Sequence, residues 1–437
     1  MKNIFTAFLI LIPLVANAQD AVSNTERFVA HLDAKAFDKA ADFFSPEVKA
    51  KIDANKLGQI WNTLAIQVGS FLKLDKVQTE EKGDFVVATG LCDFEKSYIN
   101  LKLTFDKNDQ VVGIYFLPGE PKVYYKPASY VDPNLFEEKD IELPVDFGNL
   151  PGKIMLPEKE STKKFPIVIF VHGSGSHDMD ETIGPNKPFK DLALGLAKYG
   201  IASLRYDKKT KAYPEKFLAL KDNYTVKDEV IDDAVAAVKY AKSLPNVDPD
   251  RIYVLGHSLG ATMAPRIAKN APDAAGIIVM AGYARPLEDL ILEQSKYLLG
   301  AEGTTDAEQA EISKIEKSVK AVKSKSLSLT TPAETLPLGM SASYWIDLNN
   351  FDQLKVASKL KVPILIMQGE RDYQVTMEDY NLWQQRLSKK RNVTLKSYPK
   401  LNHLFHEGEG ESRPKEYSEP NSIPEYIIKD IVRWITK

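Results

Sequence analysis

The residues from Ile252 to Ala261 read Ile-Tyr-Val-Leu-Gly-His-Ser-Leu-Gly-Ala, and this stretch decides the fold. Its apolar start predicts a buried strand, and the pattern from Ser258 to Lys269 predicts a helix directly after it. Gly256 and Gly260 stand two residues before and after Ser258, where side chains would clash around a serine held on a sharp turn. The stretch therefore predicts a strand, a strained serine at its carboxyl end, and a helix whose positive N-terminus lies beside that serine.

On both sides of this stretch, segments typical of strands and of helices alternate along the chain. Such alternation predicts an α/β fold in which a mostly parallel sheet carries helices on both faces. The functional groups of such folds lie on loops at the carboxyl ends of the strands. We expect strands at Ile167–Val171, Ile201–Leu204, Ile252–Leu255, Ala275–Ala281, Val362–Gln368 and Val393–Tyr398, and helices at Phe189–Lys198, Val226–Leu244, Ser258–Lys269, Met377–Leu387 and Ile427–Ile435.

Ser258 needs two partners to act as a nucleophile: a base that takes its proton, and an acid that orients the base. In the α/β-hydrolases, which this serine turn resembles, the acid and then the histidine follow the serine along the chain. The strand expected to end at Gln368 runs into Gly-Glu-Arg-Asp, which places Asp372 at the carboxyl end of a strand. Asp372 is the expected acid, with Glu370 and Asp379 as alternatives.

Two histidines, His403 and His406, follow Asp372 in the chain. His403 comes sooner after the strand expected to end at Tyr398, and an asparagine precedes it in the loop, so we expect His403 rather than His406 to be the base. A zinc site at His403, His406 and Glu407 is not expected, because the order of these residues matches neither helical zinc-protease motif. We expect neither a metal nor a cofactor.

A predicted strand opens into His-Gly-Ser-Gly-Ser at residues 172–176. A glycine-rich turn at this place can supply one backbone N–H to an oxyanion hole, and the residue after the serine supplies the other. We expect these donors to be the N–H groups of Leu259 and Ser174, with Gly173 as the alternative for the second. His257, next to the serine, is expected to have a structural role.

The first 18 residues have the three parts of a secretory signal peptide. Lys2 supplies positive charge, residues 4–15 form an apolar stretch, and Ala16-Asn17-Ala18 is a small-residue cleavage site. About 12 apolar residues are too few to span a bilayer, which takes roughly 20 in a helix. We expect cleavage after Ala18, a mature chain that begins at Gln19, no membrane span, and a periplasmic or secreted protein.

Residues 19–120 are expected to form a small α+β domain. Apolar residues recur at helical spacing up to about Ser70, and alternating segments rich in Val, Ile, Phe and Thr follow, which predicts helices ahead of an antiparallel sheet. This pattern resembles the small SnoaL-like and nuclear-transport-factor-like folds, which implies an accessory module able to mediate oligomers. Residues 121–134 are the expected linker to a large domain at 135–437.

The composition is that of an ordered globular protein. Of 437 residues, 44% are hydrophobic and 10% are aromatic, which argues against disorder. The 57 basic and 60 acidic residues nearly balance, so the net charge of -3 gives no general attraction to nucleic acid. Cys92 is the single cysteine and cannot form an internal disulfide.

About 80 residues separate the strand expected to end at Ala281 from the one expected to begin at Val362, far more than an ordinary connection holds. We expect a helical cap at about 283–350, placed over the carboxyl end of the sheet, where it would shape a substrate pocket. Tyr344 and Trp345 are candidates for the lining of that pocket.

With the serine turn, the His-Gly turn and the late Asp and His in this order, the chain resembles the α/β-hydrolase superfamily. The likeness covers about residues 135–437 and points to exported bacterial serine esterases related to dienelactone hydrolases and to the catalytic domains of prolyl oligopeptidases. It implies Ser258 as the nucleophile, Asp372 as the acid and His403 as the base.

These observations predict an exported serine hydrolase that cleaves small carboxylic esters through an acyl-enzyme intermediate. One alternative is a peptidase of the prolyl-oligopeptidase type, although no repeated strands typical of a propeller precede the catalytic segment. A second alternative is a non-catalytic binding protein with a degenerate hydrolase domain, against which the ordered Ser, Asp and His argue.

Overall fold

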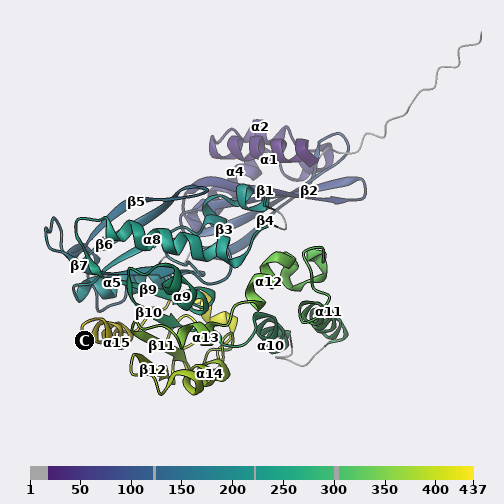
Figure 1. Cartoon of the computed structure of the whole chain (residues 1–437). Coiled ribbons are helices and arrows are strands. Elements are labelled where there is room, and N and C mark those ends of the chain that lie inside the picture. The colour runs from purple at the N-terminus through teal and green to yellow at the C-terminus, as the bar shows by residue number, and fades with distance from the viewer. Residues whose placement is uncertain (1–17, 122–124, 221–222, 300–304) are drawn as a thin grey trace, which may run out of the picture. The chain divides into compact units, whose positions relative to one another are not determined.

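The computed structural model describes residues 18–121, 125–220, 223–299 and 305–437 (Figure 1). The chain forms two compact units, residues 1–123 and residues 124–437. The expected signal peptide, apart from Ala18, lies outside the described residues.

The first unit has helices followed by a four-stranded antiparallel sheet in the order β1-β2-β3-β4. Ser45 and Asp53 accept hydrogen bonds from backbone N–H groups in the first turns of α3 and α4, which fixes where these two helices begin. Apolar side chains of α1, α2 and α4 form the core with β2, β3 and β4. The elements are α1 (Ala18–Asp33), α2 (Phe37–Ala41), α3 (Pro46–Lys51), α4 (Ala54–Val68), β1 (Phe71–Lys82), β2 (Phe85–Phe94), β3 (Ser97–Phe105) and β4 (Val111–Pro121).

The second unit is built on an eight-stranded sheet in the order β12-β11-β10-β9-β7-β8-β6-β5. The six strands from β7 to β12 run parallel, and β6 and β5 add an antiparallel hairpin at one edge. This confirms the predicted α/β fold with a mostly parallel sheet. The strands are β5 (Glu137–Val145), β6 (Gly148–Leu156), β7 (Phe165–Val171), β8 (Ala202–Tyr206), β9 (Val247–His257), β10 (Ala274–Met280), β11 (Ile364–Gly369) and β12 (Val393–Tyr398).

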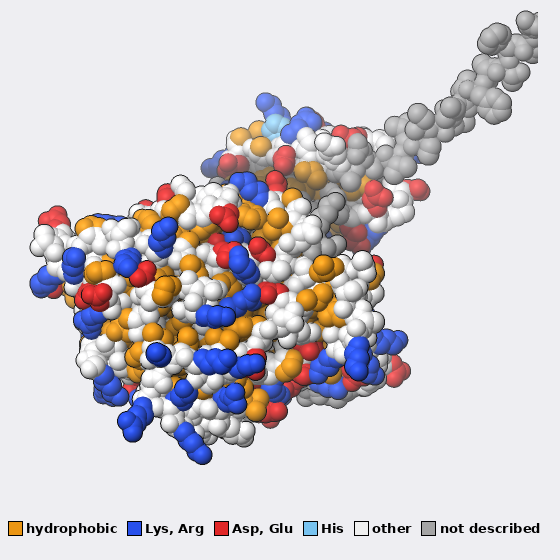
Figure 2. All heavy atoms as spheres, in the orientation of Figure 1, with side chains coloured by type: hydrophobic (Ala, Val, Ile, Leu, Met, Phe, Trp, Pro, Cys, Tyr) orange, Lys and Arg blue, Asp and Glu red, His pale blue; other side chains and the backbone are white. Residues whose placement is uncertain are grey.

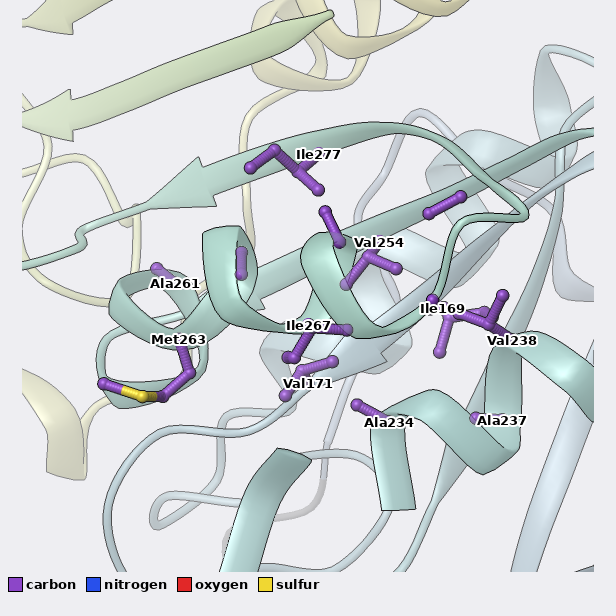
Figure 3. Packing of buried hydrophobic residues seen from close by; sticks show 14 of the residues in the cluster. Ile169, Val171, Ala234, Ala237, Val238, Val254, Ala261, Met263, Ile267 and Ile277 are labelled. Carbon is purple, nitrogen blue, oxygen red and sulfur yellow. The ribbon is translucent and has the colours of Figure 1, made fainter. Parts of the chain in front are cut away.

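Helices cover both faces of this sheet, because successive side chains of the buried strands point to opposite sides. Ile169 and Val171 of β7 pack with α8, α9 and α14 on one face, and Val168 and Phe170 pack with α5 and α15 on the other. Figure 3 shows the first of these packings, with Ile267 of α9 among strand side chains. The helices are α5 (Pro188–Lys198), α6 (Lys209–Ala212), α7 (Pro214–Leu218), α8 (Asp232–Lys242), α9 (Leu259–Asn270), α10 (Leu287–Leu299), α11 (Asp306–Val322), α12 (Ala342–Asn349), α13 (Gln353–Ala357), α14 (Met377–Leu387) and α15 (Glu425–Ile435).

The insertion between β10 and β11 forms the helical layer that the sequence predicts. Helices α10, α11 and α12 lie together beside the sheet (Figure 1), and they share a small apolar core that includes Ile291, Val322, Leu336 and Trp345. Trp345 is therefore a core residue of the cap.

The sequence analysis did not predict strands β1, β5 and β6, because their sequences lack a clear alternation of apolar and polar residues. Strand β1 has charged side chains at half of its positions, and it forms an edge of its sheet, where those side chains can stay in water. Strands β5 and β6 contain Pro144 and Pro151 within mixed polar sequence. Part of the segment expected to be a linker packs on the second unit, since the Tyr125 hydroxyl donates to Asp191 and the Tyr130 hydroxyl donates to the carbonyl of Ile423.

The surface carries mixed side-chain types. On the face drawn in Figure 2, basic, acidic and hydrophobic side chains are interspersed over the second unit. Among the described residues, no helix has the length and apolar character needed to cross a membrane.

Gly195 marks a close contact between α5 and α15. A Cβ atom at this position would lie 2.6 Å from Cγ1 of Ile428. Gly195→Ala should gain about 1 kcal/mol from helix propensity but lose about 1–3 kcal/mol from overpacking. We expect the free energy of unfolding, measured by urea titration, to fall. In an Ile428→Ala background the same change should raise it, and stabilisation in both backgrounds would contradict this packing.

Candidate active site

Ser258 lies on a strained turn between β9 and α9. Its φ of 53° and ψ of −113° are rare for a residue with a side chain. A Cβ atom on Gly256 would lie 2.2 Å from the carbonyl of Gly260, and one on Gly260 would lie 2.2 Å from the carbonyl oxygen of Val171. The N–H of Ser258 donates to the carbonyl of Met280 at 3.0 Å. Only glycine fits at both flanking positions, so the two glycines permit the turn that holds the serine.

The predicted acid and base are hydrogen-bonded to each other. Nδ1 of His403 lies 2.7 Å from Oδ2 of Asp372, and both side chains are buried. The other carboxylate oxygen accepts from the N–H groups of Gln374 and Val375, and Gln368 donates to Oδ2. These bonds fix the carboxylate, which in turn holds the Nδ1–H tautomer of His403 and leaves Nε2 free to take a proton.

The alternative residues lie in other surroundings. Glu370 is exposed and accepts from the Ser397 hydroxyl, and Asp379 forms an ion pair with Arg285. His406 is buried, and neither of its ring nitrogens has a hydrogen-bond partner in the described part of the chain. Of the candidate acids, Asp372 is the one that contacts His403.

The two expected oxyanion donors differ in how they are placed. Leu259 is the first residue of α9, so its N–H has no acceptor within the helix. The N–H of Gly173 is already used, because it donates to Oε1 of Glu181 at 2.7 Å. Among the described residues, no acceptor is found for the N–H of Ser174. Of the two alternatives in this turn, Ser174 has the available donor.

A second buried acid–base pair lies beside the first, and the sequence analysis did not find it. Nδ1 of His257 lies 2.9 Å from Oε2 of Glu181, and Nε2 of His257 lies 2.9 Å from the carbonyl oxygen of His403. Both nitrogens of His257 face acceptors, which favours the doubly protonated ring. Burial opposes charge on each group, but the attraction between the two charges has the larger effect. The pKa of Glu181 is therefore lowered to about 2, and the pKa of His257 is raised.

Ser258 and His403 line the same cavity, whose volume is about 410 Å³. Ser174 and Tyr344 also line it, while Trp345 does not. The apolar part of the wall comes mainly from the cap. The cap contributes Leu287, Leu290, Ile291, Leu338 and Met340 to this wall, and Ile183 and Val375 come from outside the cap.

This arrangement can perform nucleophilic acyl chemistry. A strained serine, an imidazole held by a carboxylate, and the turn that carries the Ser174 N–H meet at one cavity at the carboxyl end of the sheet, and the N–H of Leu259 follows directly after the serine. No group of three or more side chains suited to hold a metal ion occurs among the described residues.

A parallel sheet with a strained serine after β9 and a His–Asp pair after β11 and β12 defines the α/β-hydrolase class. The chain belongs to the serine aminopeptidase family S33 of this superfamily, which matches residues 162–411. A family of proteins of unknown function, DUF3887, matches residues 25–114. The superfamily expected from the sequence is thereby confirmed.

The chain is similar over nearly its whole length to Esterase EstD of Thermotoga maritima. The two are 38% identical over 410 residues, which cover 94% of each chain. Among solved structures, Est1E from Butyrivibrio proteoclasticus is 17% identical, with a TM-score of 0.43 over 68% of this chain and 99% of that chain. A puromycin-hydrolyzing peptidase of Mycobacterium tuberculosis is 15% identical, with a TM-score of 0.43 over 83% of this chain and 48% of that chain.

His406 should make the stability of the second unit depend on pH. Burial lowers its pKa to about 4, against an ordinary value of 6.5, with Glu416 acting to raise it and His257 to lower it. Between these two values the unfolded chain binds a proton that the folded chain does not, so stability falls as the pH falls. From pH 7.5 to pH 5 this loss is about 2 kcal/mol. His406→Leu should lose less stability over that interval in urea titrations, and equal losses in the two proteins would contradict the assignment.

Proposed function

We propose that the protein is an exported serine esterase that hydrolyses small carboxylic esters through an acyl-enzyme. The observation that carries the proposal is the buried Asp372–His403 pair at 2.7 Å, whose histidine lines the same cavity as the strained Ser258. Ester cleavage, rather than another acyl transfer, is supported by the 38% identity to Esterase EstD over 94% of both chains.

In this proposal Oγ of Ser258 attacks the acyl carbon while Nε2 of His403 takes the hydroxyl proton. The N–H groups of Leu259 and Ser174 bind the oxyanion of the tetrahedral intermediate. Collapse of the intermediate breaks the bond to the alcohol, which leaves with the proton held by His403. Water then attacks the acyl-enzyme, gives its proton to His403, and releases the carboxylic acid as the proton returns to Ser258.

Export is the part of the proposal that depends on sequence alone. Its support is the charged, apolar and small-residue succession of residues 1–18. N-terminal sequencing of protein recovered from the periplasm or medium tests it: a first residue of Gln19 is expected, and an intact Met1 would contradict cleavage.

A peptidase is the second candidate, because the matching family is described as serine aminopeptidase. A leaving amine must be protonated as it departs, which the same His403 would do. The two activities are separated by comparing an ester with the matching anilide on the same acyl group.

Hydrolysis of p-nitrophenyl esters from acetate to decanoate tests the central proposal. We expect the chain from Gln19 to hydrolyse these esters, and Ser258→Ala to abolish the turnover. Faster cleavage of p-nitroanilides than of esters would favour the peptidase. Absence of any turnover that depends on Ser258 would contradict both.

The role of Asp372 is tested on whichever ester is cleaved best. Asp372→Asn should lower kcat by up to about 10⁴-fold, because the histidine loses its correct tautomer. Asp379→Asn is the matched control, since Asp379 is equally buried but faces Arg285. Equal kcat values for these two variants would remove Asp372 from the mechanism.

A further inference from the structure

Lys208 is a buried lysine directly behind the turn that carries the Ser174 N–H. Its Nζ donates to the carbonyl of Gly173 at 2.8 Å and to the carbonyl of Gly175 at 3.0 Å, and its third donor meets Oε1 of Glu229. An ammonium group has three donors, so every one of them is used. The side chain is 3% exposed.

The bond to Gly173 fixes a direction as well as a position. The carbonyl of Gly173 and the N–H of Ser174 belong to one planar trans peptide, so they point to opposite sides. Holding the carbonyl towards Lys208 therefore turns the N–H of Ser174 away from Lys208. His177 adds a second restraint, because its Nε2 lies 2.7 Å from the carbonyl oxygen of Ser174.

Glu229 connects Lys208 to the cap. It lies in a π-helical turn, Lys227–Ile231, immediately before α8, and such turns are frequent at functional sites. While one carboxylate oxygen meets Lys208, the other accepts from the hydroxyl of Tyr344 at 2.6 Å. Tyr344 belongs to α12 and is buried. A continuous chain of contacts thus runs from α12 through Glu229 and Lys208 to the 173–175 turn.

We propose that Lys208 is a positioning residue for the oxyanion hole, and that Glu229 and Tyr344 make this positioning depend on the cap. The inference rests on the proposed function, in which the N–H of Ser174 binds the oxyanion. A cap helix that is correctly seated holds Glu229, Glu229 holds the ammonium group, and the ammonium group orients the donor. Catalysis, rather than substrate binding, is the step that this chain of contacts serves.

The test is a charge-neutral double variant, Lys208→Met/Glu229→Gln. Lys208→Met alone would leave a buried carboxylate unpaired, which is strongly destabilising, whereas the side-chain amide introduced by Glu229→Gln can still accept from Tyr344. Lys208→Arg is the second variant, because its planar fork keeps the charge but cannot reproduce the three donor directions. Folding of each is checked by the melting temperature and by circular dichroism.

The matched control is Lys209→Met/Asp233→Asn. Lys209 and Asp233 form an equally buried pair at 2.9 Å one residue further along the chain, and among the described residues neither side chain has a hydrogen bond to the 173–175 turn. This control separates the loss of a buried ion pair from the loss of the positioned donor.

We expect kcat for the best p-nitrophenyl ester to fall about 10²-fold in Lys208→Met/Glu229→Gln and in Lys208→Arg, with KM changed less than about threefold, because a donor to the transition state is displaced. The inhibition constant of phenylboronic acid, which forms a tetrahedral adduct on serine, should rise in parallel. The control should keep its kcat and its inhibition constant. A kcat of both Lys208 variants within about threefold of the starting protein would overturn the positioning role.

Tyr344→Phe tests the link to the cap separately. Removal of this hydroxyl should lower kcat by about threefold to tenfold and raise the boronic acid constant to a similar extent. An unchanged kcat would overturn the dependence on the cap while leaving the role of Lys208. If the unaltered protein shows no ester turnover that depends on Ser258, the proposed function falls, and this inference falls with it.

Discussion

The approach of Gly260 to the carbonyl oxygen of Val171 is the contact on which the site depends. It brings the first turn of α9, which begins with Leu259, against the end of β7, which is followed by the turn that carries Ser174. The same closeness forces Ser258 into its positive φ, a strain of about 1–3 kcal/mol. Burial of the apolar side of α9, with Met263 and Ile267 fully inside, offsets that strain.

Three buried acid–base pairs surround this contact and restrain the turns that carry His403 and Gly173. Asp372 orients the ring of His403, Glu181 and His257 tie the Gly173 N–H to the His403 carbonyl, and Glu229 holds Lys208 behind the same glycine turn. A buried charge is tolerated only with a partner and satisfied hydrogen bonds. For Glu181, whose pKa is about 2, the ionised form contributes stability that is lost only as the pH falls from about 4.5 towards 2. Glu181 therefore stays ionised at neutral pH, and its charge raises the pKa of His257.

The sequence predicted the central strands of the large sheet and missed β1 and the β5–β6 hairpin. Strands such as Phe165–Val171 are continuous apolar runs, which burial requires. Strands β1, β5 and β6 mix charged, polar and proline residues instead; β1 and β5 are edge strands, and β6 is the partner of β5 in its hairpin. The serine turn could be predicted because its glycines are a steric necessity. Glu181 and Lys208 could not, since a lone charged residue in a loop has no periodicity or spacing that marks it as buried.

The cap differs from the sheet in how it is held. Its own apolar core is small, and Leu290 and Tyr344 of the cap join the large cluster on one face of the sheet. Polar contacts also hold the cap on the sheet. Arg266 of α9 makes a bidentate ion pair with Asp347 of α12 at 2.8 and 3.0 Å, and Gln294 of α10 donates to the carbonyl of Gln374. Such contacts are directional, so exchanges of cap residues that take no part in them can reshape the pocket wall without disturbing the sheet. Most of the apolar pocket wall therefore lies in a different segment of the chain from Ser258, Asp372 and His403. Tyr344 of the cap connects the two through its hydrogen bond to Glu229.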